Sequence, residues 1–378
     1  MLKSHFRRFL DAEKGRLHFA AHSHHPWPDV TFEAQQQAWL DAARWADEKW
    51  EHLFGALIPE VQRQVAAELR LPSPGSLVFA PNTHELVVRL LSCLPERPRL
   101  LTTDSEFHSF ERQTRRLEEE GLVSIERVAA EPFATFNERF LAAAAKAKPH
   151  LVFFSHVFFN SGFIVPEVTA LAHALPSDAL VCLDGYHGFC AVPTDLSGIA
   201  GRAFYLAGGY KYAMAGEGAC FLHVPESAGA LRPRNTGWFA AFGALQEKQA
   251  GRVPYAEGAA RFFGATFDPS GLYRLMAALR WRQAQGLSTA KTRAHAHALQ
   301  RRFLGGLERG PISPEQLVVP EEDRRGQFLT FRTPEAKGLS EALMKKRAIT
   351  DARDDRLRFG FGPYQDEADV DAVLERLG

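Results

Sequence analysis

The sequence has few cysteines and lacks any long apolar run, and each absence excludes a class of protein. Its 378 residues include only four cysteines, namely Cys93, Cys182, Cys190 and Cys220. They have no C-x-x-C spacing and lie in apolar surroundings, which indicates reduced thiols and excludes a disulfide framework. No apolar run approaches the roughly 20 residues of a membrane-spanning helix. Because the basic N-terminal stretch also lacks the apolar core of a signal peptide, we expect a cytoplasmic protein with no membrane partner.

An excess of charge of one sign is also absent. Lys and Arg together number 45, and so do Asp and Glu. A balanced charge gives no general attraction for polyanions, so a nucleic-acid partner is not expected. The apolar fraction of 46% and the charged fraction of 24% are typical of a globular protein. The length favours two domains over one.

The apolar pattern changes along the chain. Residues 29–70 have apolar side chains at steps of three and four, which predicts helix with one apolar face that includes Trp39 and Trp50. From residue 76 onward, short apolar runs alternate with amphipathic stretches. Continuous apolar strands separated by helices indicate an α/β fold with a mostly parallel sheet covered on both faces. The predicted strands are 76–80, 99–103, 123–128, 150–156, 179–184, 204–206 and 219–224.

This alternation stops after about residue 230. A long helical stretch follows over roughly 270–308, and the remaining residues predict a small α+β unit. We therefore expect an N-terminal segment at 1–28, a large domain at 29–255 and a small C-terminal domain at 256–378.

Polar and aromatic residues follow the predicted strands, where ligands of such sheets bind. Asn82 and Thr83 stand between a strand and a helix, and a helix N-terminus holds phosphate well. An ordinary helix cap by either residue is the alternative. Phe107 follows the next strand, and its ring suits stacking on a flat ligand. A plain core position is the alternative for this phenylalanine.

Asp184 ends another apolar strand, and His187 follows three residues later. A buried carboxylate is costly unless a cation pairs with it, so Asp184 is a stronger functional candidate than a surface acid. His187 by itself favours neither a functional nor a structural role.

A single lysine, Lys211, lies between two predicted strands in the stretch "FYLAGGYKYAMAGEGACFLHV". The small residues around it allow the backbone to approach a bulky planar group. A phosphate site, an aromatic face, a strand-end Asp and a strand-end Lys, in this order, fit pyridoxal 5′-phosphate. Lys211 would form the Schiff base, and Asp184 would keep the pyridine nitrogen protonated so that the ring withdraws electrons.

These motifs resemble those of a known family. The segment "LDGYHGFCAVPTDLSGIAGRAFYLAGGYKYAMAGEGACFLHV" is similar to the Asp-x-x-His … Gly-Tyr-Lys-Tyr segment of kynureninases, within the class V aminotransferase group of fold type I enzymes. "SEFHSF" resembles the family's ring-stacking loop, "NTHE" its phosphate loop, "NTGWFA" its Gly-Trp-Phe loop and "RLRFGFGPY" its arginine segment. The resemblance covers roughly residues 15–375.

The resemblance implies a role for each matching position. Lys211, Asp184 and His187 match the catalytic lysine, the pyridinium partner and the histidine near the ring. The implied cofactor ligands are these three together with Asn82, Thr83, Phe107, Ser155, Tyr210, Trp238 and Thr266. Trp238 and Thr266 match loops that complete the phosphate site of a neighbouring subunit, which implies a homodimer with shared active sites. Arg358 matches the arginine that holds the substrate carboxylate, a planar bidentate donor.

The chain departs from the family where the distal part of the substrate should bind. Kynureninases usually have Phe-Pro-x-Asp where this chain has Phe107, His108, Ser109 and Phe110, and an Asn-Ser turn where it has "AAHSHHPWP". We expect His22, Ser23, His24 and Phe110 to line the substrate pocket, with a polar loop as the alternative for the histidine stretch.

The implied reaction is hydrolysis of a kynurenine-type amino acid that releases alanine. A class V aminotransferase is the nearest alternative, because both reactions begin with the same proton transfer. A cysteine desulfurase is less favoured, since no cysteine follows Cys220. Metal binding by His22, His24 and His25 lacks a fourth ligand, so we expect no metal. A non-catalytic binding relative is disfavoured because Asp184 and Lys211 are both retained.

Overall fold

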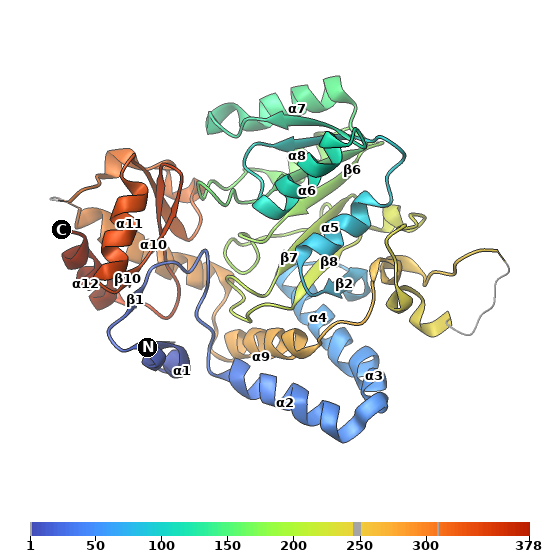
Figure 1. Cartoon of the computed structure of the whole chain (residues 1–378), viewed down its shortest axis with the longest axis horizontal. Helices are drawn as coiled ribbons and strands as arrows, with labels where there is room; N and C mark the ends of the chain where they lie inside the picture. The colour runs from blue at the N-terminus through green and yellow to red at the C-terminus, as the bar shows by residue number, and fades with distance from the viewer. Residues whose placement is uncertain (1, 245–250, 308–309) are drawn as a thin grey trace.

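The structure is a computed structural model, and it describes residues 2–244, 251–307 and 310–378. Its centre is a seven-stranded sheet with the order β2-β8-β7-β6-β5-β3-β4 (Figure 1). Within this sheet β8 is antiparallel to both neighbours, and the other pairs are parallel. The strands are β2 (Leu77–Ala80), β3 (Arg99–Thr103), β4 (Ser124–Val128), β5 (Leu151–Ser155), β6 (Leu180–Asp184), β7 (Ala203–Gly208) and β8 (Cys220–His223).

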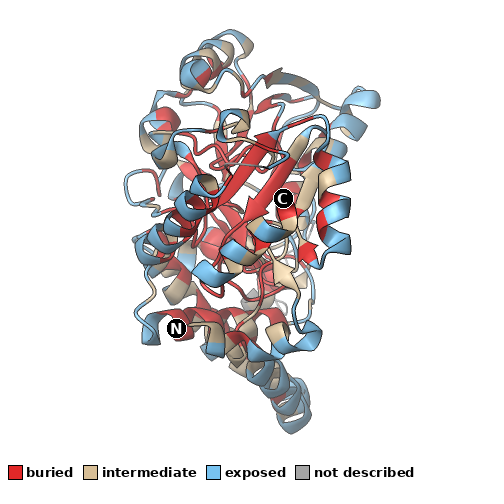
Figure 2. Cartoon of the chain, turned by 90° about the vertical axis from the view of Figure 1, so that its left-hand side faces the viewer, coloured by how far each residue is buried: buried red, intermediate tan, exposed pale blue. Residues whose placement is uncertain are grey.

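The central strands are continuously apolar because helices and loops cover both faces of the sheet. Every residue of β2, β5, β7 and β8 is buried. Figure 2 shows that buried residues lie toward the inside of the molecule, while the outer faces of the helices are exposed. The covering helices include α5 (Thr83–Leu91), α6 (His108–Glu119), α7 (Phe136–Ala147) and α8 (Val168–Ala174). The predicted α/β fold with a mostly parallel sheet is confirmed.

The helical stretch predicted at 29–70 is divided into α2 (Val30–Trp45), α3 (Lys49–His52) and α4 (Ile58–Leu69). The break after α2 is at Ala46, which has a φ of 47°. The prediction that Trp39 belongs to the apolar face that packs on the core is wrong, because this residue is 71% exposed. Asp41 is buried instead, and it accepts a hydrogen bond from the Tyr273 hydroxyl at 2.9 Å. Periodicity therefore located the helices but not the face of α2 that packs on the core.

The second domain is built on β9 (Phe328–Arg332), β11 (Asp351–Arg353) and β12 (Arg356–Gly360), an antiparallel sheet in the order β11-β12-β9. Its separate core also includes side chains of α10 (Thr289–Gly305), α11 (Ala336–Lys345) and α12 (Glu367–Leu377). The preceding helix, α9 (Ser270–Ala284), lies beside α2 (Figure 1) and contributes Leu272 and Leu275 to the first core. Residues 256–284 were expected in the small domain, but they include a helix, α9, that packs against the large domain.

The N-terminal segment joins the second domain before it reaches α2. Strand β1 (Leu17–His18) pairs in parallel with β10 (Ala348–Ile349), and Ala20 forms a bridge with Gly360. This pairing brings residues 20–25 against the carboxyl-end loops of the large sheet, as the contact between Lys211 and His22 demonstrates. Within the described ranges, no helix is long and apolar enough to cross a bilayer.

Candidate active site

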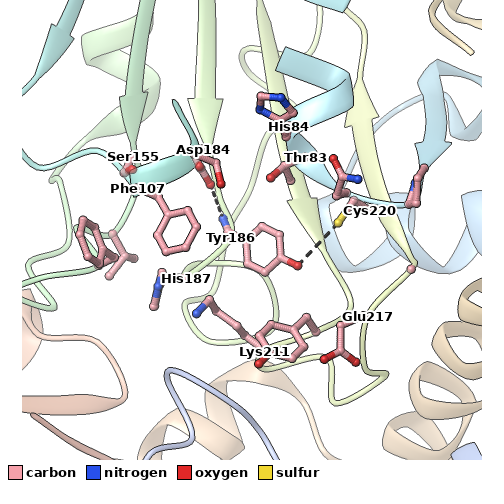
Figure 3. A pocket seen from close by; sticks show the side chains of 17 residues that line it. Thr83, His84, Phe107, Ser155, Asp184, Tyr186, His187, Lys211, Glu217 and Cys220 are labelled. Atoms are coloured by element: carbon pink, nitrogen blue, oxygen red, sulfur yellow. Dashed lines mark hydrogen bonds between the residues drawn. The ribbon is translucent and has the colours of Figure 1, made fainter. Parts of the chain in front are cut away.

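A pocket of about 270 Å³ lies beyond the carboxyl ends of the parallel strands (Figure 3). Loops after β2, β3, β5, β6 and β7 all contribute to its wall, because parallel strands direct these loops to one edge of the sheet. The residues predicted from the sequence that line it are Asn82, Thr83, Phe107, Ser155, Asp184, His187, Tyr210 and Lys211. Side chains that are distant along the chain therefore meet in one space.

Lys211 follows β7, and its side chain is buried at the base of the pocket. Its Nζ donates a hydrogen bond to the carbonyl oxygen of His22 at 2.6 Å. Burial, with the nearby charge of Arg358, lowers the pKa of Lys211 to about 7, although Asp184 opposes the shift. A substantial fraction of this amine is neutral near pH 7 and is able to act as a nucleophile or a base.

Asp184 ends β6 and lines the same pocket as Lys211, from the opposite side in Figure 3. Its Oδ1 accepts a hydrogen bond from the backbone N–H of Tyr186 at 2.8 Å. Burial raises the pKa of Asp184 to about 6, whereas the Tyr186 N–H and the charge of Lys211 act in the opposite direction. The carboxylate has no ion-pair partner within 4.0 Å among the described residues, so it is suited to a cationic N–H of a ligand.

His187 presents an imidazole nitrogen without a hydrogen-bond partner. Its Nδ1 is buried and unpaired, and the residue lines the pocket. Burial, followed by the charge of Lys211, holds the pKa of His187 well below its ordinary value, so the ring is neutral. Buried polar atoms are normally hydrogen-bonded, so this nitrogen is available to a ligand in the pocket. Together, the Lys211 amine, the Asp184 carboxyl and the His187 imidazole therefore suit a ligand with both a carbonyl and a ring nitrogen.

Another wall of the pocket is formed by the N-terminus of α5 together with the loop that contains Gly218. Asn82 caps α5, since its Oδ1 accepts from the Glu85 N–H at 2.9 Å, and the ordinary cap weighed for this residue is therefore present. Thr83 begins the helix and faces the pocket with Gly218, whose φ of 90° favours glycine. The Glu85 N–H is taken by this cap and the Thr83 backbone bonds the Cys220 thiol, whereas the dipole of α5 favours an anion such as phosphate at this end.

Aromatic side chains cover the pocket from two directions. Phe107 is 42% exposed and contacts Phe159 edge to face, with ring centroids 5.5 Å apart. The Tyr186 ring centroid is 5.8 Å from the Lys211 Nζ, and its hydroxyl lies 3.6 Å from the Cys220 Sγ. Phe159, Tyr186 and Cys220 line the pocket but were not predicted. The sequence signal for Tyr186 was its place between Asp184 and His187 in "DGYH".

Arg358 lies next to the pocket rather than on its wall. Its guanidinium is buried, pairs with Asp351 and donates to the carbonyl oxygen of Phe159, which does line the pocket. His22 is also buried, with its Nε2 3.6 Å from the Asp351 Oδ2 and its ring stacked on Phe328. Burial, with the charge of Arg358, lowers the pKa of His22 to about 3, so this imidazole is neutral. The sequence did not single out Asp351, the carboxylate that joins them.

Several other predicted positions do not line this pocket. Phe110 is 4% exposed and stacks on Phe153 with ring centroids 3.8 Å apart, so it belongs to the core beneath α6, contrary to expectation. His24 Nδ1 shares a hydrogen bond of 3.0 Å with the Tyr210 hydroxyl and thus supports a pocket residue, while Ser23 is half-buried beside it. Trp238 donates to the Thr266 Oγ1 at 2.8 Å, away from the pocket.

The three histidines considered for a metal site have separate partners. His22 faces Asp351, and His24 faces Tyr210. His25 bonds the carbonyl oxygen of Pro26 and packs on Tyr364. Across the part of the chain that is described, no three His, Cys, Asp or Glu side chains converge as metal ligands.

Residues 292–377 match the family model described as the kynureninase C-terminal domain. A kynureninase from Pseudomonas fluorescens is 30% identical over 236 residues, which are 60% of this chain and 55% of that relative. An isopenicillin N epimerase from Amycolatopsis lactamdurans is 32% identical over 115 residues, which are 30% of this chain and 29% of the epimerase. The chain thus matches about half the length of the kynureninase.

Solved structures match over nearly the whole chain. The cystine C–S lyase C-DES has a TM-score of 0.83 at 18% identity, with coverage of 97% of this chain and 98% of that one. A C-DES variant with glycine covalently linked to its PLP cofactor has a TM-score of 0.82 at 19% identity, covering 98% of each chain. A cysteine desulfurase from Thermococcus onnurineus NA1 has a TM-score of 0.79 at 18% identity, covering 98% and 96%. These likenesses confirm the predicted fold type I architecture.

Proposed function

We propose that this chain, a kynureninase-like member of the class V aminotransferase group with the fold type I architecture, is a pyridoxal 5′-phosphate-dependent hydrolase of a kynurenine-type amino acid. The observation that carries the proposal is the convergence of Lys211, Asp184 and His187 in one pocket. A partly neutral amine, a buried carboxyl and an unpaired neutral imidazole together suit this cofactor.

The pocket offers one partner for each end of the cofactor. When bound, pyridoxal 5′-phosphate would supply an aldehyde that reacts with amines and a pyridine ring that withdraws electrons from the substrate α-carbon. Lys211 would hold the aldehyde, and the Asp184 carboxylate would hold the proton of the ring nitrogen. Thr83 and the N-terminus of α5 would hold the phosphate. Phe107 would cover the ring face.

The residues of the chain then move protons and position the substrate. The neutral Nζ of Lys211 would take the α-proton and return it later, a task for which a pKa of about 7 is well matched. Arg358 would hold the substrate carboxylate once Asp351 has exchanged out of the ion pair. The aromatic pair of Phe107 and Phe159 would limit the access of bulk water. Water attack on the γ-carbonyl would release alanine and an acid.

A class V aminotransferase is the second candidate, because Lys211 and Asp184 would serve both reactions. Cysteine desulfurization is disfavoured. The pocket-lining thiol, Cys220, is buried, and burial raises its pKa to about 12, so it is a poor nucleophile near neutral pH.

Incubation of the cofactor-loaded enzyme with kynurenine tests the proposal. We expect equal amounts of anthranilate and alanine without any keto acid acceptor, measured by anthranilate fluorescence and amino-acid analysis. Amino transfer that depends on an added keto acid, without anthranilate, would instead support the aminotransferase. A chain that changes kynurenine in neither way would exclude both activities on this substrate.

We also propose a homodimer with shared active sites. The half-buried Trp238 and the exposed Thr266 lie away from the pocket of their own chain, and Trp39 is exposed on α2. Exposed aromatic side chains of this size are typical of interfaces. Light scattering of the purified protein is expected to give twice the mass of 42.1 kDa, and a monomer would contradict the proposal.

A further inference from the structure

Glu106 is a buried carboxyl group behind the pocket to which no step above assigns a role. It follows β3 and is 4% exposed. Its Oε1 accepts from the Thr103 hydroxyl at 2.6 Å and from the Ser155 N–H at 3.1 Å, and its Oε2 lies 2.6 Å from the Ser155 Oγ. No Lys, Arg or His in the described ranges forms an ion pair with it. A buried carboxyl with neutral partners is expected to hold a proton.

The titratable groups that face Glu106 strengthen this expectation. Asp184 is the register partner of Ser155 on the neighbouring strand, and its negative charge adds to the effect of burial on Glu106. Together they raise the pKa of Glu106 to about 8, although its hydrogen bonds with Ser155 and Thr103 oppose the shift. Cys182, also on β6, is a buried thiol whose pKa is raised well above its ordinary value, so it remains neutral. One carboxyl group, that of Asp184, thus lines the pocket, and a second, that of Glu106, lies behind it.

The contact between Glu106 and Ser155 permits two proton arrangements. An ionised Glu106 accepts the Ser155 O–H, which leaves only lone pairs of Ser155 for the pocket. A neutral Glu106 donates its own O–H to the Ser155 Oγ, which frees the serine O–H to donate to a ligand. Ser155 lines the pocket and Glu106 does not, so the carboxyl acts on a ligand through the serine.

We propose that Glu106 is a positioning residue whose proton decides whether the Ser155 hydroxyl donates into the pocket or accepts from it. The proposal rests on the proposed function, because pyridoxal 5′-phosphate has anionic oxygens that a donor would favour. Ionisation of Glu106 withdraws this donor and places a second negative charge near Asp184. The pocket therefore holds the anionic cofactor more tightly while Glu106 is neutral.

Binding of 4′-deoxypyridoxine 5′-phosphate to the full chain tests the proposal, because this analogue has no aldehyde and its affinity excludes imine formation. Dissociation constants are measured by fluorescence from pH 6.5 to 9.5 for the wild type and for Glu106→Gln. The glutamine amide donates to Ser155 at every pH. We expect the wild-type affinity to fall about tenfold more over this range than that of Glu106→Gln, as for one hydrogen bond to a charged group. Ionisation of Lys211 affects both proteins, and Asp184, with a pKa of about 6, is already mostly ionised over this pH range.

Matched variants separate this role from a structural one. Glu96→Gln, which alters an exposed carboxylate, should retain the wild-type pH dependence. In a Ser155→Ala background, the Glu106→Gln change should lose most of its effect, because the hydroxyl that transmits it is gone. Parallel pH dependences for the wild type and Glu106→Gln would overturn the proposal.

Infrared titration of the ligand-free chain is the independent measurement. The band of a protonated buried carboxyl should disappear near pH 8 in the wild type and be missing in Glu106→Gln. If that band is absent from the wild type, Glu106 holds no proton and the proposal fails. If the band is present but neither protein binds the analogue, the proposed cofactor function fails, and with it the role of Glu106 toward that cofactor.

Discussion

Replacement of Lys211 by alanine is expected to abolish the visible absorbance of the cofactor-loaded protein and to lower kcat by about 100-fold to 10,000-fold. The side chain is the amine that would hold the aldehyde and move the α-proton, and it lies buried in the pocket with Asp184. Absorption spectra of the purified protein with pyridoxal 5′-phosphate, followed by steady-state kinetics, measure both effects. A retained absorbance band would show that another group holds the aldehyde.

The pH dependence of cofactor attachment is a second test of the role proposed for Lys211. Only the neutral amine attacks an aldehyde, and the pKa of Lys211 is lowered to about 7. Attachment should therefore slow about tenfold per pH unit below pH 7 and level off above it. Lys337→Ala, which removes a lysine whose side chain is 85% exposed, serves as the control and should leave absorbance and kinetics unchanged.

Replacement of Asp184 by asparagine is expected to lower kcat about 100-fold to 1,000-fold while stabilising the ligand-free chain above pH 6. An amide is unable to hold the proton of the pyridine nitrogen, so a preorganised electrostatic contact is lost. The free energy of unfolding of the variant is expected to rise although kcat falls. The pKa of Asp184 is raised from 3.8 to about 6, so its folded-state contribution is present below pH 4 and is lost as pH rises through 6.

Asparagine has no such ionisation, so at pH 8 the variant should be more stable by on the order of 1–3 kcal/mol. Urea unfolding at pH 5 and pH 8, with kinetics on the same samples, measures the two effects. Asp178→Asn replaces an exposed carboxylate and should change neither. Full activity in Asp184→Asn, or a lower stability at pH 8, would contradict the proposed role.

The sheet and the ends of its strands were predictable because their signals are local. Apolar runs such as 151–155 and 180–184 form strands that helices cover on both faces, and their polar ends face the same pocket. Lys211 and Asp184 could be identified because burying a single charged side chain at the end of an apolar strand is energetically costly, which favours a functional role. Their place in one pocket then followed from the parallel arrangement of the strands.

Other contacts had no local signal. Phe110 is three residues beyond Phe107, and only the packing of α6 sets it against Phe153 in the core. Trp39 fits the apolar period of α2 but is exposed, because periodicity identifies a face and not what covers it. Gly185 is restricted by Tyr205, whose ring would overlap an added Cβ, although 20 positions separate them.

The sequence by itself determined which residue types follow each strand of the large sheet. These residue types in turn indicate the kind of ligand that they suit. Only the tertiary structure decided which of these residues face the pocket. It also decided that Arg358 forms an ion pair with Asp351 and that Glu106 lies behind Ser155. Secondary structure follows from side-chain periodicity within a few residues. Burial, pKa shifts and ion pairs depend on segments far apart in the chain, and these meet only when the two domains and the N-terminal segment pack together.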